Sequence, residues 1–340
     1  MWTCPPPLAS LSSLVADPTL LDRHLVFVAG KGGAGKSTVT AALALLAARA
    51  GKRVLVCEVN APQPRIAALL GAEGPVDAPG PRELLPGLHA LNVLPAAAMH
   101  EYGLMVLRFR AVTHAVFENR LIRYFLRAIP SLAELVVLGK ILHEARSRGP
   151  KGPRWDLVLV DAPATGHAIQ LLRVPSALLD AVPAGPLRHD AEWMERLLVD
   201  PVQTAVALVT LPEETPVNEA IELDAQVRGV LGMSRAGLFV NAVPATRLAP
   251  AEVAALAGAR DAPPPLGPAV RAATLASIRA EEARRHVGRL RAALDLPTTL
   301  LPLVPSVGWG PRQVEAVAGA IARAWQGGEE AAWTSCWGAG

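Results

Sequence analysis

The most regular feature of the chain is a series of short apolar runs separated by longer, helix-like stretches. The runs span residues 25–29, 54–59, 156–160, 204–210, 236–241 and 299–304, and several are rich in β-branched residues. Alternating strand and helix patterns of this kind are typical of a sheet wound in both directions. We therefore expect an α/β fold with a doubly wound, mainly parallel sheet, and the chain shows no internal repeat.

The stretch between residues 59 and 156 is far longer than a single crossover helix requires. Within about 95–150, apolar side chains recur at roughly helical spacing, which predicts an inserted subdomain of two or three amphipathic helices. These apolar positions are Leu104, Leu107, Phe117, Leu121, Tyr124, Phe125, Leu132, Leu135 and Leu138. We expect them to form the subdomain's own core.

The segment VFVAGKGGAGKST, residues 26–38, places a glycine-rich turn between the first apolar run and an alanine- and leucine-rich helix. It matches the spacing G-x-x-x-x-G-K-[ST], in which backbone N–H groups close around phosphate oxygens at a helix N-terminus. Lys36 is expected to reach the β- and γ-phosphates, and Ser37 to bind Mg²⁺. The nucleotide-binding residues predicted here are Gly30, Gly32, Gly33, Ala34, Gly35, Lys36, Ser37 and Thr38.

A carboxylate marks the end of another apolar run, in RWDLVLVDAPATGHAIQLLR, residues 154–173. The run ends at Asp161, which places its side chain at the carboxyl edge of the sheet, beside the glycine-rich turn. There it can hold Mg²⁺ directly or through water. The alternative is that Asp161 caps the following helix.

Two segments carry a family resemblance. KGGAGKST resembles the deviant phosphate loop of the MinD/ParA/ArsA ATPases, and DAPATGHAIQLL resembles the switch motif of the ArsA and GET-pathway (tail-anchored-protein targeting) ATPases. The resemblance covers about residues 21–325 and implies ATP and Mg²⁺ as cofactors. It also implies a switch that senses the γ-phosphate, in which Gly166 permits a conformational change. The switch residues are Asp161, Ala162, Pro163, Ala164, Thr165 and Gly166.

A second lysine in the loop, Lys31, is not needed by an ordinary phosphate loop. In the family that this chain resembles, such a lysine reaches across a dimer to the partner's nucleotide. The resemblance therefore implies a catalytic Lys31 in a homodimer, or in a heterodimer with a paralogous ATPase. The alternative is a solvated loop lysine.

Two asparagines stand at positions that the family uses. The resemblance assigns Asn241, in AGLFVNAV, to adenine, whose N6/N7 edge suits a carboxamide, although asparagine is also a common turn residue. Asn60 stands where the family carries its water-activating aspartate, and a carboxamide can orient water without accepting its proton. Glu58 lies on the same face by strand periodicity and is the candidate replacement, unless it only bonds loop amides.

Composition excludes several classes of function. The net charge is only +3 and the arginines are scattered along helical stretches, which argues against nucleic-acid binding. The three cysteines lie far apart, which argues against zinc, disulfides and the thiolate cluster expected for arsenite. No apolar stretch reaches the roughly 18–20 residues of a membrane span, and the start lacks a basic signal region. We expect a cytoplasmic protein without an integral membrane segment.

The expected organisation has three parts: an extension over residues 1–20, a P-loop ATPase domain over 21–326 with a helical insertion at about 95–150, and a disordered tail over 327–340. The implied function is a dimeric switch ATPase. In GET-type relatives the helical subdomain forms a groove for a hydrophobic protein client. One alternative, favoured by Asn60, is a weakly or non-hydrolysing subunit that pairs with an active paralogue. The other is a MinD/ParA-like positioning ATPase.

Overall fold

The structure is a computed structural model that describes residues 20–72, 80–107, 132–150, 152–245, 248 and 250–337. Its centre is an eight-stranded sheet in the order β10-β9-β8-β1-β7-β2-β4-β3. Neighbouring strands are parallel except for β3, which runs antiparallel to β4. The strands are β1 (Leu25–Gly30), β2 (Val54–Val59), β3 (Arg82–Leu85), β4 (Leu88–Val93), β7 (Leu157–Asp161), β8 (Thr204–Thr210), β9 (Arg235–Val243) and β10 (Thr298–Pro302). The mainly parallel sheet confirms the predicted fold class.

Each of the six apolar runs forms a strand, and the structure adds β3 and β4 at one edge of the sheet. A separate two-stranded ribbon joins β5 (Arg148–Gly149) to β6 (Gly152–Pro153). The central strands are buried on both faces, because helices cover both sides of the sheet. On β1, for example, Phe27 belongs to the core on one face and Val28 to the core on the other. A strand with two buried faces is apolar at every position rather than at alternate ones.

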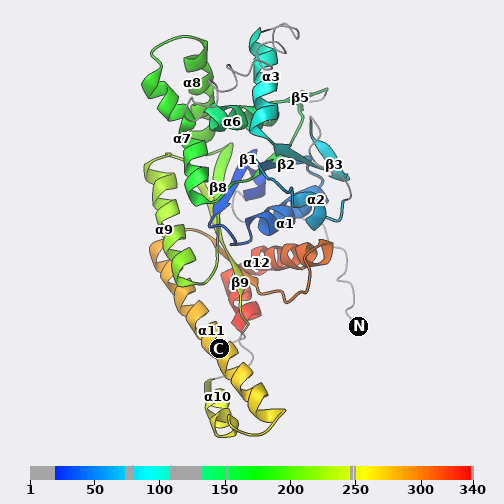
Figure 1. Ribbon diagram of the computed structural model, residues 1–340, viewed down its shortest axis with the longest axis vertical. Helices are drawn as coiled ribbons and strands as arrows, with labels where there is room; N and C mark the ends of the chain where they lie inside the picture. The colour runs from blue at the N-terminus through cyan, green and yellow to red at the C-terminus, as the bar shows by residue number, and fades with distance from the viewer. Residues whose placement is uncertain are drawn as a thin grey trace.

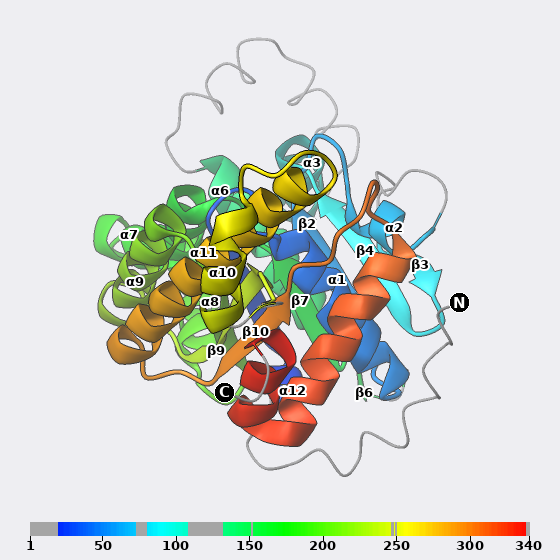
Figure 2. The same ribbon diagram turned by 90° about the horizontal axis from the view of Figure 1, so that it is seen from below.

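The helices form two layers, which both views show on opposite sides of the sheet (Figures 1 and 2). One layer contains α1 (Lys36–Arg49), α2 (Ile66–Leu69) and α12 (Pro311–Trp337), with α1 packed against α12. The other contains α7 (Thr165–Ala181), α8 (Pro186–Val199), α9 (Glu214–Gly229) and α11 (Leu266–Ala293). The remaining short elements are η2 (Leu20–Asp22), α10 (Pro250–Leu256) and η3 (Ala257–Ala259).

The predicted helical insertion is described in part. Its two described helices, α3 (Pro95–Leu107) and α6 (Leu132–Ala145), pack against each other and lie above the sheet with α8 in Figure 1. Leu135 and Leu138 are buried in the core that α6 shares with the sheet, and Leu132 packs against it. At Leu132, Leu135 and Leu138, the helical spacing of apolar residues is therefore explained by packing in the core. Leu104 and Leu107 belong to α3, whereas Phe117, Leu121, Tyr124 and Phe125 lie outside the described residues.

The C-terminal segment differs from the sequence expectation. The residues from 327 onward were expected to be a disordered tail, but α12 continues as far as Trp337. Its first half packs against β10 and α1, and buried side chains such as Val314 and Ile321 anchor it. An anchored helix can extend past its last core contact, which a pattern of weak apolar periodicity does not reveal. Among the described residues, no helix is both long enough and apolar enough to cross a membrane.

Candidate functional site

The glycine-rich turn joins β1 to α1 at the carboxyl end of the strand. Gly33 and Gly35 have positive φ angles of 86° and 90°, and Gly35 is the N-cap of α1. This left-handed conformation is accessible to glycine at no steric cost, which explains the glycines of the motif. The turn therefore presents backbone N–H groups at the start of a helix, an arrangement suited to anions.

Lys36 lies across this turn. Its Nζ donates hydrogen bonds to the carbonyl oxygens of Gly30, at 3.1 Å, and Lys31, at 3.2 Å. Burial lowers the pKa of the Lys36 ammonium, while the charge of Asp161 acts in the opposite direction. The ammonium is thus held inside the curve of the loop, where it faces the space that the loop amides surround.

Ser37 and Asp161 meet although they are far apart in the sequence. The Ser37 hydroxyl donates a hydrogen bond of 2.6 Å to Oδ2 of Asp161, because β7 pairs with β1 and ends beside the loop. Burial raises the pKa of the Asp161 carboxyl, and the Ser37 hydrogen bond opposes that rise. The N-cap of the following helix is Ala164, so Asp161 is not its cap.

This pair of oxygen ligands fits Mg²⁺. The second carboxylate oxygen of Asp161, Oδ1, is buried and has no hydrogen-bond partner within the described residues. Hard cations prefer carboxylate and hydroxyl oxygens, and Mg²⁺ retains several waters or phosphate oxygens as its other ligands. Across the described ranges, no group of three or more His, Cys, Asp or Glu side chains is placed to hold a metal. A cation here would therefore depend on Ser37, Asp161 and ligands that are not protein.

Lys31 is held within its own chain. Its Nζ forms an ion pair of 2.8 Å with Oε1 of Glu219 in α9, and the two side chains are 33% and 36% exposed. A cavity of about 420 Å³ opens beside this pair. Its walls are the loop residues Lys31, Gly32 and Gly33, the β8–α9 connection at Leu211 and Glu213, and the start of α9 at Glu214–Pro216. Lys31 thus has a partner within its own chain in this structure, and its role toward a second subunit stays a prediction.

The predicted switch segment begins beside β1 and the phosphate loop. The backbone N–H of Ala162 donates to the carbonyl of Val28, and a side chain built at Gly32 would lie 3.9 Å from Cβ of Ala164. Pro163 precedes Ala164, and Gly166 lies in the first turn of α7. Oγ1 of Thr165 is buried without a hydrogen-bond partner in the described part of the chain. The segment that contains the predicted switch residues thus begins beside the phosphate loop.

Glu58 and Asn60 occupy different environments, contrary to the expected shared face. The strand ends at Val59, and Asn60 leaves it in a left-handed conformation with a φ of 46°, so the strand alternation stops before Asn60. Glu58 is buried at 2% exposure, whereas Asn60 is exposed. Asparagine tolerates positive φ better than most residues, which is one physical reason for its presence here.

Glu58 binds loop amides, as the simpler interpretation expected. Its Oε1 accepts hydrogen bonds from the backbone N–H groups of Arg65, at 2.6 Å, and Ile66, at 3.2 Å, at the start of α2. A carboxylate is favourable beside a helix N-terminus. Glu58 also lies directly opposite Asp161 in the register of β2 and β7, so it borders the site.

Sequence reasoning missed Asn92, which is buried in β4. Its Oδ1 accepts from the N–H of Ala61 at 3.1 Å, and its Nδ2 donates to the carbonyl of Ala61 at 2.9 Å. These two bonds hold the turn that begins at Asn60. The available signal was a single polar residue inside the apolar segment LNVL, because a buried carboxamide requires partners.

Asn241 lies against the phosphate loop. It is inside β9, which continues to Val243, and not at the strand's end as the sequence suggested. Its Nδ2 donates to the carbonyl of Ala34 at 2.9 Å, and a Cβ added at Gly35 would lie 2.1 Å from that nitrogen. The structure therefore brings this carboxamide to the edge of the site, and its role toward adenine stays a prediction.

Comparisons with known proteins agree with this arrangement. Residues 23–183 match the family model described as anion-transporting ATPase. The chain is 35% identical over 208 residues to the ATPase BagA of Mycobacterium tuberculosis, a match that covers 58% of this chain and 59% of that protein. It is 30% identical over 238 residues to an arsenical pump-driving ATPase of Escherichia coli, covering 69% of this chain and 37% of the relative.

A eukaryotic relative matches as well. The ATPase ASNA1 homolog of Entamoeba dispar is 28% identical over 193 residues, which cover 51% of this chain and 52% of that protein. In each of these three comparisons the match spans less than two thirds of the relative's length. Both the phosphate loop and the switch segment fall inside the region that the family model matches.

Proposed function

We propose that this chain, which matches the family model described as anion-transporting ATPase over residues 23–183, is a Mg²⁺-dependent switch ATPase that closes as a dimer around ATP. The observation that carries the proposal is the contact of 2.6 Å between Ser37 and Asp161, with Lys36 held across the adjacent glycine turn. Burying a carboxylate oxygen without a hydrogen-bond partner, as for Oδ1 of Asp161 among the described residues, is costly, which supports a site built for a metal and phosphates.

The proposed binding step uses groups already in position. The amides of Gly32–Ser37 and the Lys36 ammonium bind the phosphate oxygens, while Lys36 exchanges its two carbonyl partners for them. Ser37 and Asp161 hold the cation, which when bound would neutralise charge on the β- and γ-phosphates. Asn241, which donates to the carbonyl of Ala34, would turn its carboxamide to the adenine edge.

The proposed switch is the segment from Ala162 to Gly166. It lies beside Gly32 of the phosphate loop and leads into α7, so a change at the γ-phosphate would act on the start of that helix. Order changes of this kind are the usual way in which nucleotide state is read. In the dimer, Lys31 would leave Glu219 and approach the nucleotide of the partner subunit.

A second function is favoured by one observation. Asn60, at the turn where the family's water-activating aspartate is expected, offers no group that accepts a proton at ordinary pH. The chain would then bind ATP and close without hydrolysing it, as the subunit that supplies Lys31 to an active paralogue. Both functions include a cytoplasmic ATPase domain over residues 21–326 with the helical insertion, and a hydrophobic protein client is the proposed cargo of either.

One set of measurements separates these functions. The full chain is purified alone and with candidate paralogues, and ATP binding, phosphate release and oligomer mass are recorded with and without Mg²⁺. Binding, turnover and an ATP-dependent dimer of the chain alone support the switch ATPase. Binding and dimerisation without turnover support the non-hydrolysing subunit. Absence of nucleotide binding in the folded protein refutes both.

A further inference from the structure

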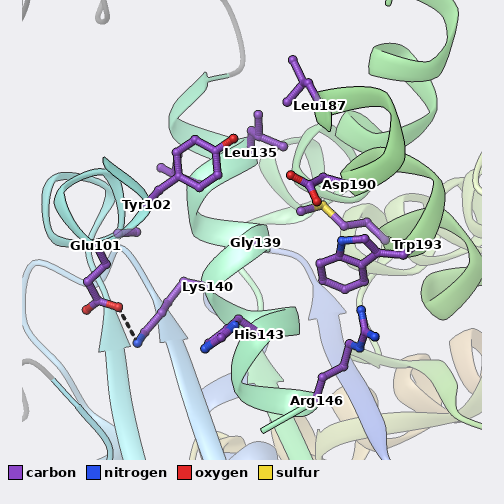
Figure 3. Close-up of a pocket in the computed structure, with 13 residues that line it drawn as sticks. Glu101, Tyr102, Leu135, Gly139, Lys140, His143, Arg146, Leu187, Asp190 and Trp193 are labelled. Carbon is purple, nitrogen blue, oxygen red and sulfur yellow. Dashed lines mark ion pairs between the residues drawn. The ribbon is translucent and has the colours of Figure 1, made fainter. Parts of the chain in front are cut away.

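A second cavity lies between α3, α6 and α8, and no residue of the phosphate loop or the switch lines it (Figure 3). Its volume is about 630 Å³, within the range of about 300–1,000 Å³ that is usual for small-molecule sites. Most of its wall is apolar, formed by Ala98, Leu135, Val136, Leu187 and Met194. A few polar groups lie at its two ends, and these decide what it can bind.

One end of the cavity is cationic. The Arg146 guanidinium lies over the ring of Trp193, with its central carbon 4.6 Å from the ring centroid, and within the described residues it has no carboxylate partner. His143, one turn earlier on α6, lines the same end. Lys140 differs, because Glu101, at 2.6 Å, and Glu144, at 3.0 Å, already neutralise it. Among the described residues of this wall, Arg146 is therefore the arginine or lysine whose hydrogen-bond donors are not already used by a carboxylate.

The opposite end is acidic. Asp190 lies on α8, three residues before Trp193, and Figure 3 shows it well separated from Arg146, with the Trp193 ring between them. Tyr102 lines this end from α3, and burial together with the charge of Asp190 raises the pKa of its hydroxyl. The hydroxyl therefore stays protonated at neutral pH and can donate a hydrogen bond. A ligand with anions at both ends would be repelled by Asp190.

We propose that this cavity binds a small amphipathic carboxylate, with its carboxylate on Arg146 and its apolar chain along the wall toward Leu187. Arg146 is suited to the head group because a planar guanidinium offers paired donors that match a carboxylate. The contact with the Trp193 ring favours this position of the exposed guanidinium, which reduces the side-chain entropy lost on binding. The apolar walls receive the chain, and Asp190 selects against dianions.

The test uses three probes that share a chain and differ in the head group: octanoate, octanol and octylammonium. Each is titrated against the full chain by calorimetry and by displacement of 8-anilinonaphthalene-1-sulfonate, without nucleotide. We expect octanoate to bind saturably and more tightly than octanol or octylammonium. Equal affinities for the three would show an apolar cavity without head-group recognition and would overturn the proposal, as would the absence of saturable binding.

Variants locate the site. Arg146→Gln should lower the affinity for octanoate about 10-fold or more, the usual contribution of a charge-assisted hydrogen bond. The affinity for octanol should not change. Arg196→Gln is the matched control, because this exposed arginine of α8 lies outside the cavity lining. Wild-type affinity in Arg146→Gln overturns the assignment. An apolar helical peptide that displaces the dye equally from the wild type and Arg146→Gln would assign the cavity to a protein client instead.

A third variant covers the case in which Arg146→Gln fails to fold. Leu187→Trp adds bulk to a half-buried residue at the acidic end and should abolish octanoate binding while the circular dichroism spectrum stays native. Octanoate binding that persists unchanged in folded Leu187→Trp places the ligand elsewhere and refutes the proposal. None of these readouts uses ATP, so the outcome is independent of the proposed ATPase function.

Discussion

Glu219→Gln tests whether Lys31 acts across a dimer. In the isolated chain Glu219 holds the Lys31 ammonium at 2.8 Å, and both side chains are about one third exposed. If Lys31 must reach the partner's nucleotide, this ion pair has to break before the dimer closes. Removing the carboxylate should therefore favour ATP-dependent dimerisation, provided that Lys31 acts in trans.

The size of the effect follows from the exposure of the pair. Ion pairs at exposed positions contribute about 0.2–1 kcal/mol. Because about 1.4 kcal/mol corresponds to a factor of ten in an equilibrium constant, releasing one lysine should raise the dimerisation constant about 1.4- to 5-fold. A symmetric dimer releases two, so the dimerisation constant should rise by about 2- to 25-fold. The gain should shrink at high salt, because screening weakens the pair in the wild type as well.

Sedimentation velocity with Mg²⁺ and a non-hydrolysable ATP analogue measures the dimerisation constant. Glu222→Gln is the matched control, since it removes the same charge from an exposed position of α9 without touching Lys31. The reasoning is refuted if Glu219→Gln and Glu222→Gln behave alike, or if Glu219→Gln weakens the dimer. If the wild-type chain binds the analogue and stays monomeric, Lys31 does not act on a partner's nucleotide within a homodimer.

Three further changes address the phosphate site. Lys36→Ala should lower ATP affinity about 100-fold or more, as measured by calorimetry with Lys52→Ala as the control. Near-normal affinity of Lys36→Ala would exclude a phosphate-binding role for Lys36. Asn60→Asp should raise phosphate release about tenfold or more, because it restores a group that accepts a proton; unchanged turnover would mean that this turn does not position the attacking water. Asp161→Asn should raise the melting temperature of the nucleotide-free protein at pH 7, because burial raises the folded-state pKa of Asp161, so ionisation above the unfolded pKa of about 4 destabilises the fold. That advantage should shrink as the pH falls toward 4, and calorimetry that finds Asp161→Asn less stable at pH 7 would contradict it.

The sequence predicted the central strands because their environment leaves a simple pattern. Strands covered by helices on both faces are continuously apolar, and every run of that type became a strand. β4 was missed because His89 and Asn92 interrupt its apolar pattern, and the partners that satisfy Asn92 lie on another segment. β3 is short and partly exposed, so its extended form depends on pairing with β4.

The candidate site was predictable only where local rules or sheet geometry determine it. Ser37 and Asp161 follow from a loop and a strand end at one edge of a parallel sheet. The partner of Lys31 is 188 positions away on α9, and no local pattern indicates which carboxylate meets it. Asn60 was expected to continue the alternation of β2, but its positive φ ends that alternation, and a backbone angle of this kind is set by the turn as a whole.

Gly30 has a consequence for the sequences that this fold can accept. A methyl group added there would lie 2.0 Å from the backbone carbonyl oxygen of Val209, which no side-chain rotation can relieve. Any other residue would have to push β8 away from β1, and the β8–α9 connection that walls the cavity beside Lys31 would move with it. In a saturation library scored for folding and for nucleotide binding, position 30 should therefore tolerate glycine alone, whereas Gly33, which has open space around it, should admit asparagine with only a partial loss.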